Sequence, residues 1–334
     1  MIDRATTSSL AKGMPFLAAD VGGTHARLAL VRAGASAGQP IEVLAFHKYD
    51  CTDYTSLVDF IIEFLATHDG RGVDRGVVAS AGYALDDGTV ITTNLPWPLS
   101  IRETREHLGF ADLRLVNDFE AVAYAAAALP TLETTHITGP YESTVNGPML
   151  VLGPGTGLGA AVWIPRSDRP FVLATEAGQA SLAANNELEL ALLAQLLKQH
   201  AHVTIEHVLS GPGILNLYNA LAVLRGAKPV LSKPSQITAA AQTGDDVLAR
   251  ETLEVFCGFL GSVVGDMALT YGVQGGIRLA GGILPQIRDF LPNSDFVARY
   301  LNKGPMRPAL ERIPVRLVEH GQLGVVGAAH WYLN

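Results

Sequence analysis

The strongest constraint on the fold is a short pattern that occurs twice. In residues 20–29 an apolar strand runs into Gly22-Gly23-Thr24 and then into a second apolar strand. A partial echo spans residues 152–161, where residues 153–159 supply the glycine-rich turn. Glycine allows such tight turns, and successive backbone N–H groups there can hold an anion. The repetition indicates an internal duplication that gives two related domains facing one another.

The elements expected around this repeat predict an α/β fold. Three strands joined by glycine-rich turns predict an antiparallel meander at 16–19, 27–31 and 41–49. Capping pairs before apolar stripes predict helices that start at Ser56 and Ser100. Further strands are expected at 77–81, 90–93, 113–116, 278–283 and 315–318, and further helices at 120–129, 187–199, 212–225, 245–271 and 325–333. Strands that alternate with helices after a meander are typical of α/β proteins.

Composition narrows the class of protein. The chain has 334 residues, 48% of them hydrophobic and 17% charged, which predicts a folded protein of two domains or one large one. The net charge of -8 and the lack of a basic run argue against nucleic-acid and membrane partners. Two distant cysteines, Cys51 and Cys257, are expected to be reduced and buried. The polar N-terminus, and apolar runs shorter than roughly 18 residues, predict a cytoplasmic protein.

Several common kinds of site are absent from the sequence. There is no P-loop, no Gly-x-Ser-x-Gly elbow and no metal spacing among the ten histidines. Residues 155–160 fit the pattern Gly-x-Gly-x-x-Ala, and Glu176 follows where a dinucleotide fold places its ribose-binding acid. That fingerprint requires a helix after the glycines, whereas residues 161–165 read as a strand ending in Pro165. A nicotinamide-binding fold is therefore disfavoured.

Two polar pairs stand at the ends of expected strands. Asp118 follows Asn117 just before a helix, so it is a candidate general base, with the N-cap of that helix as the alternative. Asn94 follows Thr93, and it is a candidate sugar ligand or an ordinary turn residue.

Two carboxylates and three glycine turns complete the candidates. Glu176 and Glu206 are either surface acids or ligands for sugar hydroxyls, which proteins hold by directed hydrogen bonds. The turns at 22–23, 153–159 and 281–282 each follow an apolar strand. They are either simple turns or three parts of one nucleotide site.

In sequence order, these segments resemble the bacterial glucokinase family of the hexokinase/actin-like ATPase superfamily. The similar segments lie at 20–30, 93–97, 116–119, 153–159, 209–218 and 280–283, and the resemblance covers nearly all of the chain after the tail. It implies two actin-like ATPase (ribonuclease H-like) α/β domains flanking a cleft that closes on glucose. The expected boundaries are a flexible tail at 1–13, a small domain at 14–128 plus 320–334, and a large domain at 129–319.

The resemblance also implies an activity and residue roles. It implies phosphorylation of glucose at the 6-hydroxyl to glucose 6-phosphate and ADP, with ATP and Mg²⁺ as cofactors and a homodimer as the assembly. Asp118 is expected as the general base, and Asp20 lies near the Mg-phosphate site. The implied sugar ligands are Asn94, Asn117, Asp118, Glu176, Gln179 and Glu206. The implied nucleotide residues are Asp20, Gly22, Gly23, Thr24, Gly155, Thr156, Gly157, Gly281 and Gly282. None is predicted to be a dedicated metal ligand.

One segment departs from the family pattern. The family usually has Glu-Gly-Gly-His where residues 176–179 read Glu-Ala-Gly-Gln. Gln179 can donate and accept hydrogen bonds but carries no charge. A sugar-binding regulatory relative with little turnover is therefore one alternative. A kinase for another hexose or an amino sugar is the other.

Overall fold

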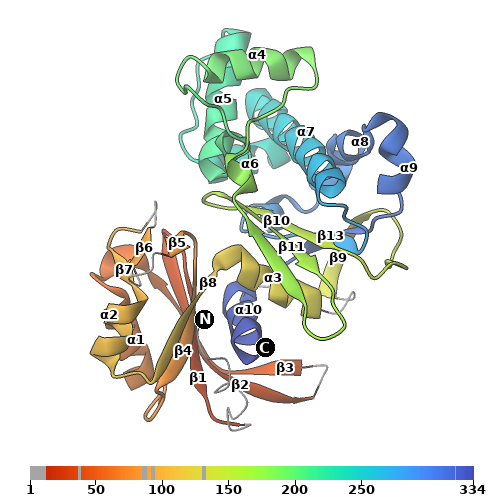
Figure 1. The fold of residues 1–334 in the computed structure, drawn as a ribbon. Coiled ribbons are helices and arrows are strands. Elements are labelled where there is room, and N and C mark those ends of the chain that lie inside the picture. The colour runs from red at the N-terminus through yellow and green to blue at the C-terminus, as the bar shows by residue number, and fades with distance from the viewer. Residues whose placement is uncertain (1–12, 37–38, 85–88, 92–94, 130–132, 320) are drawn as a thin grey trace. The chain divides into compact units, whose positions relative to one another are not determined.

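The chain forms two compact units. The computed structural model describes residues 13–36, 39–84, 89–91, 95–129, 133–319 and 321–334. Unit 1 comprises Met1–Ala128 and His320–Asn334, and unit 2 comprises Leu129–Glu319 (Figure 1). The expected tail at 1–13 lies outside the described residues apart from Gly13. Each unit has its own apolar core and is described by itself.

Unit 1 is built on a mixed sheet with the strand order β3-β2-β1-β4-β8. The antiparallel meander predicted for the start of the chain is confirmed, because β1 pairs with β2 and β2 with β3 in antiparallel fashion. β4 and β8 continue the sheet parallel to β1. The strands of unit 1 are β1 (Phe16–Val21), β2 (His25–Ser36), β3 (Gln39–Asp50), β4 (Arg75–Ser80), β8 (Asp112–Asn117) and a small sheet of β5 (Tyr83–Ala84), β6 (Thr89–Ile91) and β7 (Leu99–Ser100).

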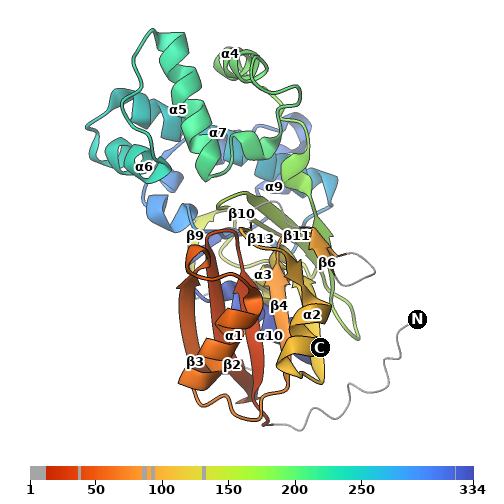
Figure 2. The ribbon, with the colours of Figure 1, turned by 90° about the vertical axis from the view of Figure 1, so that its left-hand side faces the viewer.

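Two apolar clusters cover the faces of this sheet. On one face, α1 (Leu57–Thr67) and α2 (Ile101–Leu108) pack against residues such as Leu17 and Leu28. On the other face, α10 (Leu323–Leu333) packs beside α3 (Asp118–Ala128), as Figures 1 and 2 show. The predicted caps are confirmed, because the hydroxyls of Ser56 and Ser100 each accept from a backbone N–H at 3.3 Å.

Unit 2 repeats the strand order of unit 1. Its sheet runs β12-β11-β10-β13-β14-β9, with β10, β13 and β14 parallel and β11 and β12 antiparallel to their neighbours. β9 adds an antiparallel edge strand. The bounds are β9 (Thr134–Thr138), β10 (Met149–Pro154), β11 (Leu158–Ile164), β12 (Phe171–Thr175), β13 (Gly276–Leu279) and β14 (Val315–Val318). The glycine turns of the sequence repeat thus join β1 to β2 and β10 to β11, at equivalent places.

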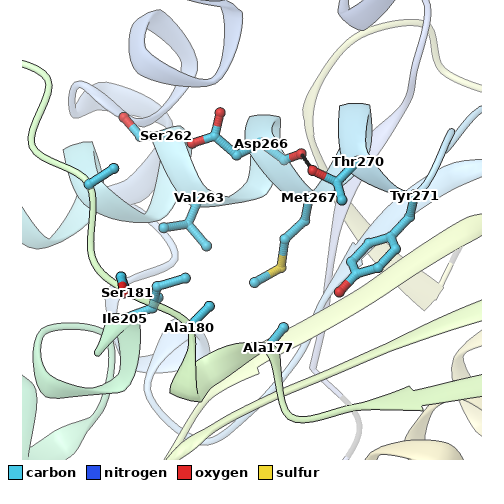
Figure 3. Close-up of a pocket in the computed structure, with 11 residues that line it drawn as sticks. Ala177, Ala180, Ser181, Ile205, Ser262, Val263, Asp266, Met267, Thr270 and Tyr271 are labelled. Carbon is cyan, nitrogen blue, oxygen red and sulfur yellow. Dashed lines mark hydrogen bonds between the residues drawn. The ribbon is translucent and has the colours of Figure 1, made fainter. Parts of the chain in front are cut away.

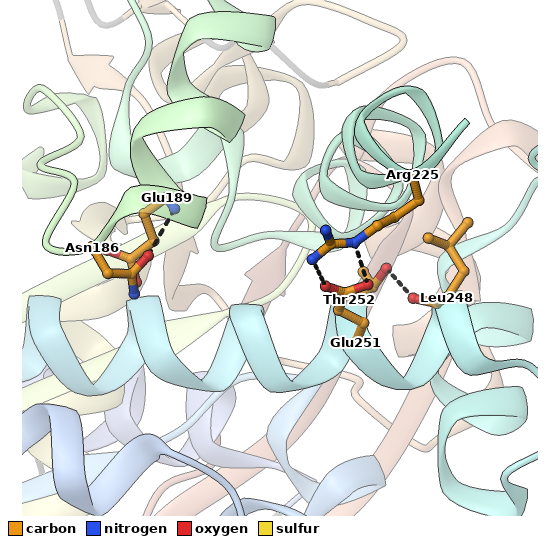
Figure 4. Close-up of polar contacts among 6 residues, drawn as sticks. All are labelled: Asn186, Glu189, Arg225, Leu248, Glu251 and Thr252. Carbon is orange, nitrogen blue, oxygen red and sulfur yellow. Dashed lines mark hydrogen bonds and ion pairs between the residues drawn. The ribbon is translucent and has the colours of Figure 1, made fainter. Parts of the chain in front are cut away.

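Helices and short 3-10 turns cover one face of the unit 2 sheet. Their bounds are η4 (Ala177–Gln179), α4 (Glu187–Leu196), η5 (Ile205–His207), α5 (Gly211–Arg225), α6 (Pro234–Thr243), α7 (Val247–Thr270), η6 (Leu284–Ile287), η7 (Leu291–Asn293), α8 (Phe296–Leu301), η8 (Gly304–Met306) and α9 (Arg307–Leu310). Figure 4 shows the Arg225–Glu251 ion pair that joins α5 to α7, with Nη2 and Oε1 2.5 Å apart. It also shows Asn186, which caps α4 by accepting from Glu189 N at 2.8 Å.

Helix α7 is the central helix of unit 2. By length and composition it is apolar enough to cross a membrane, and it is the one such helix among the residues that the structure describes. However, 78% of its apolar stretch is buried inside the protein, where Phe256, Leu260 and Val264 join the core. The helix predicted at 245–271 is therefore confirmed, and its hydrophobicity is that of a core helix.

Candidate active site

In unit 1 the predicted residues lie at one edge of the sheet. β1, β4 and β8 run parallel, and their register places Asp20 beside Ala79, and Ser80 beside both Val21 and Asn117. Ligands of α/β proteins bind at the carboxyl ends of such strands. The fold therefore brings Asp20 and the pair Asn117-Asp118 to the same edge of one sheet, although they are far apart in sequence.

Asn117 and Asp118 form the junction between β8 and α3. Asn117 Oδ1 accepts from the backbone N–H groups of Phe119 and Glu120, each at 3.0 Å. Asp118 Oδ1 accepts from Phe119 N at 2.9 Å. The capping role is thus carried largely by Asn117, while Asp118 is the first residue of α3. A carboxylate at this end of a helix is stabilised by the helix dipole, which suits a residue that must be ionised to act as a base.

Asp20 lies at the end of β1, beneath the start of α10. Its Oδ2 is 3.3 Å from Arg27 Nη1. Gly324 of α10 leaves room for it, because a Cβ at that position would overlap the Asp20 carboxylate. Burial raises the pKa of the Asp20 carboxyl, and the positive charge of Arg27 opposes that effect. Burial therefore makes the ionised form of Asp20 costly.

The first glycine turn is held by its own backbone and by Cys51, which follows β3. Gly22 N donates to His25 O at 3.0 Å, and Cys51 N donates to Thr24 O at 2.9 Å. The Cys51 thiol is buried and donates to Gly22 O at 3.3 Å. Both cysteines are buried and free, as the sequence predicted. Thr24 itself is exposed at the surface of unit 1.

The second glycine turn is held by residues from other parts of unit 2. Gly155 N donates to Gly157 O at 2.7 Å, and Gly211 N at the start of α5 donates to Gly155 O at 2.8 Å. Glu206 Oε2 accepts from Leu158 N at 2.7 Å. Space is open beside Gly155, where a Cβ would meet nothing within 4 Å. Thr156 is exposed. The strand β11 follows the turn, so the dinucleotide fingerprint is excluded as the sequence predicted.

The third glycine turn lies against the second. Gly281 has a φ of +89°, a left-handed conformation that favours glycine, and a Cβ there would lie 2.5 Å from Pro154 O. Ala280 N donates to Leu152 O at 2.8 Å and joins the two segments directly. Space is open beside Gly282. Unit 2 thus places two of the three predicted phosphate or nucleotide turns side by side.

Two of the three predicted sugar residues of unit 2, Gln179 and Glu206, are joined by a side-chain hydrogen bond. Gln179 Nε2 donates to Glu206 Oε1 at 3.1 Å, while the other carboxylate oxygen holds the second glycine turn. Glu176 precedes η4, where Gln179 N donates to Glu176 O at 2.9 Å. Both Glu176 and Gln179 are exposed. Asn94, the remaining predicted sugar ligand, lies outside the described residues.

Beside η4 lies a small pocket that was not predicted from the sequence. It has a cavity volume of about 220 Å³. In Figure 3, Val263 and Met267 of α7 point toward Ala177, Ala180 and Ile205. The remaining lining residues are Ser181, Ala183, Ser262, Asp266, Thr270 and Tyr271. The sequence does not reveal this pocket, because Val263 and Met267 belong to an apolar stripe that is typical of an ordinary core face.

Comparisons with known proteins span nearly the whole chain. A family model described as Glucokinase matches residues 17–334. The chain is 55% identical over 319 residues to a glucokinase-like protein of Xylella fastidiosa (strain 9a5c), covering 96% of this chain and 95% of that one. It is 37% identical over 317 residues to a glucokinase of Saccharophagus degradans, with 95% and 98% covered. The crystal structure of glucokinase from an Antarctic psychrotroph is similar, with a TM-score of 0.82, 38% identity, and 95% and 98% covered.

Proposed function

The chain belongs to the glucokinase family of enzymes, and from that premise we propose that it transfers the γ-phosphoryl group of ATP to the 6-hydroxyl of glucose. The products are glucose 6-phosphate and ADP. The observation that carries the proposal is the position of Glu206, whose carboxylate contacts both Leu158 N at the second glycine turn and Gln179 in the predicted sugar loop. One side chain therefore stands between the proposed nucleotide and sugar residues of unit 2.

Asp118 is the proposed general base. It accepts the proton of the 6-hydroxyl as O6 bonds to the γ-phosphorus and the bond to the β–γ bridging oxygen breaks. Phosphoryl transfer needs positioning and charge stabilisation more than covalent chemistry, so a well-placed carboxylate suits the role of base. The proposed sugar ligands are Asn94, Asn117, Asp118, Glu176, Gln179 and Glu206. Their amides and carboxylates offer the directed hydrogen bonds that ring hydroxyls require.

The glycine turns are the proposed phosphate and nucleotide site. Open space beside Gly155 and Gly282 leaves room for a ligand to approach the backbone. The proposed residues are Gly22, Gly23, Thr24, Gly155, Thr156, Gly157, Gly281 and Gly282. The proposal includes the actin-like ATPase fold of each unit, for which the shared strand order is the support. It also includes a cytoplasmic location and a homodimer.

Asp20 is the proposed contact for Mg²⁺ bound with ATP. Among the described residues, no group of three His, Cys, Asp or Glu side chains could hold a metal ion. A single carboxylate fits Mg²⁺ all the same, because this ion is usually held by one or two carboxylates together with substrate phosphates and water. The bound ion would supply charge stabilisation for the transferring phosphoryl group.

A second candidate function is a sugar-binding regulatory protein with little turnover. Two observations favour it: Gln179 stands where the family usually has His, and the relative at 55% identity is itself called glucokinase-like. The Gln179 amide nevertheless makes a hydrogen bond to Glu206. We favour the kinase because the other segments that resemble the family are present.

ADP release from MgATP tests these two functions directly. Purified protein is assayed with glucose, mannose, fructose, galactose, glucosamine and N-acetylglucosamine in parallel. The proposal predicts strong release that depends on glucose and weaker release with the other sugars. Stronger turnover with another sugar would identify that sugar, instead of glucose, as the substrate. Sugar-induced thermal stabilisation without ADP release would favour the regulatory protein.

A further inference from the structure

The turn that carries Glu206 is closed by an unusual pair of hydrogen bonds. Thr204 N donates to His207 Nδ1 at 2.9 Å, and the Thr204 hydroxyl lies 2.9 Å from the same nitrogen. In the reverse direction, His207 N donates to Thr204 Oγ1 at 3.3 Å. Together these contacts form a capping box around η5. In the usual capping box the returning side chain is Glu or Gln, whereas here it is an imidazole, a ring that can gain a proton in acid.

The geometry determines the protonation state of this ring. A backbone N–H can only donate, so His207 Nδ1 must accept with a lone pair. The ring is therefore neutral, and its proton is on Nε2. A proton on Nδ1 would point at the Thr204 N–H and break the capping box.

The surroundings of His207 favour the neutral ring. The His200 ring packs against it with centroids 4.2 Å apart. Burial lowers the pKa of His207, the neighbouring His200 and His202 lower it further, and the Glu206 carboxylate opposes them. From α5, the uncharged Asn216 amide donates to His207 O at 3.0 Å. The capping box is thus complete above the ordinary histidine pKa and is lost as the pH falls through the lowered value.

η5 is connected directly to the proposed sugar residues. Glu206 lies between the two residues of the capping box, and its carboxylate contacts Leu158 N and Gln179. The ring of His202 contacts Gln179 O at 3.1 Å. A change in η5 would therefore move Glu206 relative to both Gln179 and the second glycine turn.

We propose that His207 is a positioning residue for sugar binding, and that its neutral ring fixes η5 so that Glu206 and Gln179 keep the arrangement that receives the sugar. This inference rests on the proposed function, because it takes Glu206 and Gln179 as sugar ligands. The proposal predicts that protonation of His207 in acid weakens sugar binding. This loss of affinity can be measured without phosphoryl transfer.

Sugar affinity measured by calorimetry without ATP tests the proposal independently of turnover. Glucose is titrated from about pH 8 to about pH 5, because the lowered pKa of His207 places its change of charge in the acid part of the histidine range. A capping interaction corresponds to roughly a five- to tenfold change in an equilibrium, so the dissociation constant should rise toward that factor as the ring becomes protonated at the acid end. His207→Asn offers an oxygen acceptor that does not titrate, so its dissociation constant should stay nearly constant. His107→Gln, on the exposed face of α2, is the matched control and should follow the wild type.

His207→Leu and the ring tautomer complete the test. His207→Leu removes the acceptor, so its affinity should be low at every pH. Nitrogen NMR of the histidine rings should find His207 with its proton on Nε2. An Nδ1–H tautomer, or an equal acid loss in wild type and His207→Asn, would overturn the proposal. Sugar binding with this pH dependence but without ADP release would refute the kinase and leave the role of His207 intact.

Discussion

The first and second glycine turns, which join β1 to β2 and β10 to β11, occupy equivalent places in sheets of the same strand order. Different groups hold them in place. In unit 1, the turn is held by the backbone N–H of Gly22 and by the backbone N–H and thiol of Cys51. In unit 2, the turn is held by the Glu206 carboxylate and by Gly211 at the start of α5. The contacts described for the first turn thus include no proposed sugar ligand, whereas those of the second include Glu206. Duplication of the strand order has not duplicated the support of the turn.

The largest effect on stability is expected from a comparison between a buried ion pair of unit 2 and an exposed ion pair of unit 1. Arg299 and Glu189 form a buried pair in unit 2, with Nη1 and Oε1 2.6 Å apart. Arg299→Leu leaves the Glu189 charge buried and should lower the free energy of unfolding by about 3–5 kcal/mol. Arg32→Leu removes the exposed pair with Glu42 in unit 1 and should have no measurable effect. Urea unfolding of both variants measures the difference, and similar losses would contradict the expectation.

Asp118→Asn should have the largest effect on chemistry. The amide keeps the shape of the side chain but cannot accept the proton of the 6-hydroxyl, so turnover should fall by at least about 100-fold. Sugar affinity from calorimetry should change much less. Asp74→Asn, an exposed acid of the same unit, is the control. Turnover near the wild-type value in Asp118→Asn would show that Asp118 is not the general base.

Alanine at the two turns tests their different support directly. A Cβ at Gly157 would lie 2.5 Å from Glu206 Oε2, whereas at Gly22 the nearest atom is His25 O at 3.6 Å. Gly157→Ala should displace the Glu206 side chain. Sugar binding should then weaken by roughly tenfold, which corresponds to the loss of about one hydrogen bond to a charged group. Gly22→Ala should leave sugar affinity without nucleotide unchanged. Equal effects on sugar affinity would show that the turns are supported alike.

Asp20 should show the smallest effect, in the pH dependence of stability. Because its pKa is raised in the folded protein, the folded state holds the proton more tightly than the unfolded state. The wild type should therefore lose stability relative to Asp20→Asn as the pH rises from the ordinary value of 3.8 through the raised pKa. Unfolding curves of both proteins across that range measure the difference. A difference that does not change with pH would contradict the burial of a carboxylate that ionises with difficulty.

The sequence predicted the elements that carry local signals. Ser56 and Ser100 as caps, and Gly226 after the end of α5, placed three helices because cap chemistry is read within a few residues. β9 and β12 were missed, because an edge strand is defined by its partner rather than by its own residues. α6 was missed as well, since its N-cap, Lys233, makes no side-chain capping bond. The contacts that each site residue makes were harder to predict.

Individual site residues could be named from the sequence, but their contacts could not. Glu206 and Leu158 lie 48 positions apart, and only the fold brings the carboxylate to that N–H group. The role of His207 depends on which ring nitrogen meets Thr204, which no spacing reveals. The order of Asn117 and Asp118 suggested a base or a cap, and the hydrogen bonds assign the cap mainly to Asn117.

The identity of the phosphorylated product is the sharpest test of the proposed function. Wild type and Asp118→Asn are incubated with MgATP and glucose, and the sugar product is identified by phosphorus and carbon NMR while ADP is quantified. We expect glucose 6-phosphate in equal amount to ADP from the wild type, and neither from the variant on the same time scale. ADP without a phosphorylated sugar, phosphate on another hydroxyl, or equal product from both proteins would contradict it.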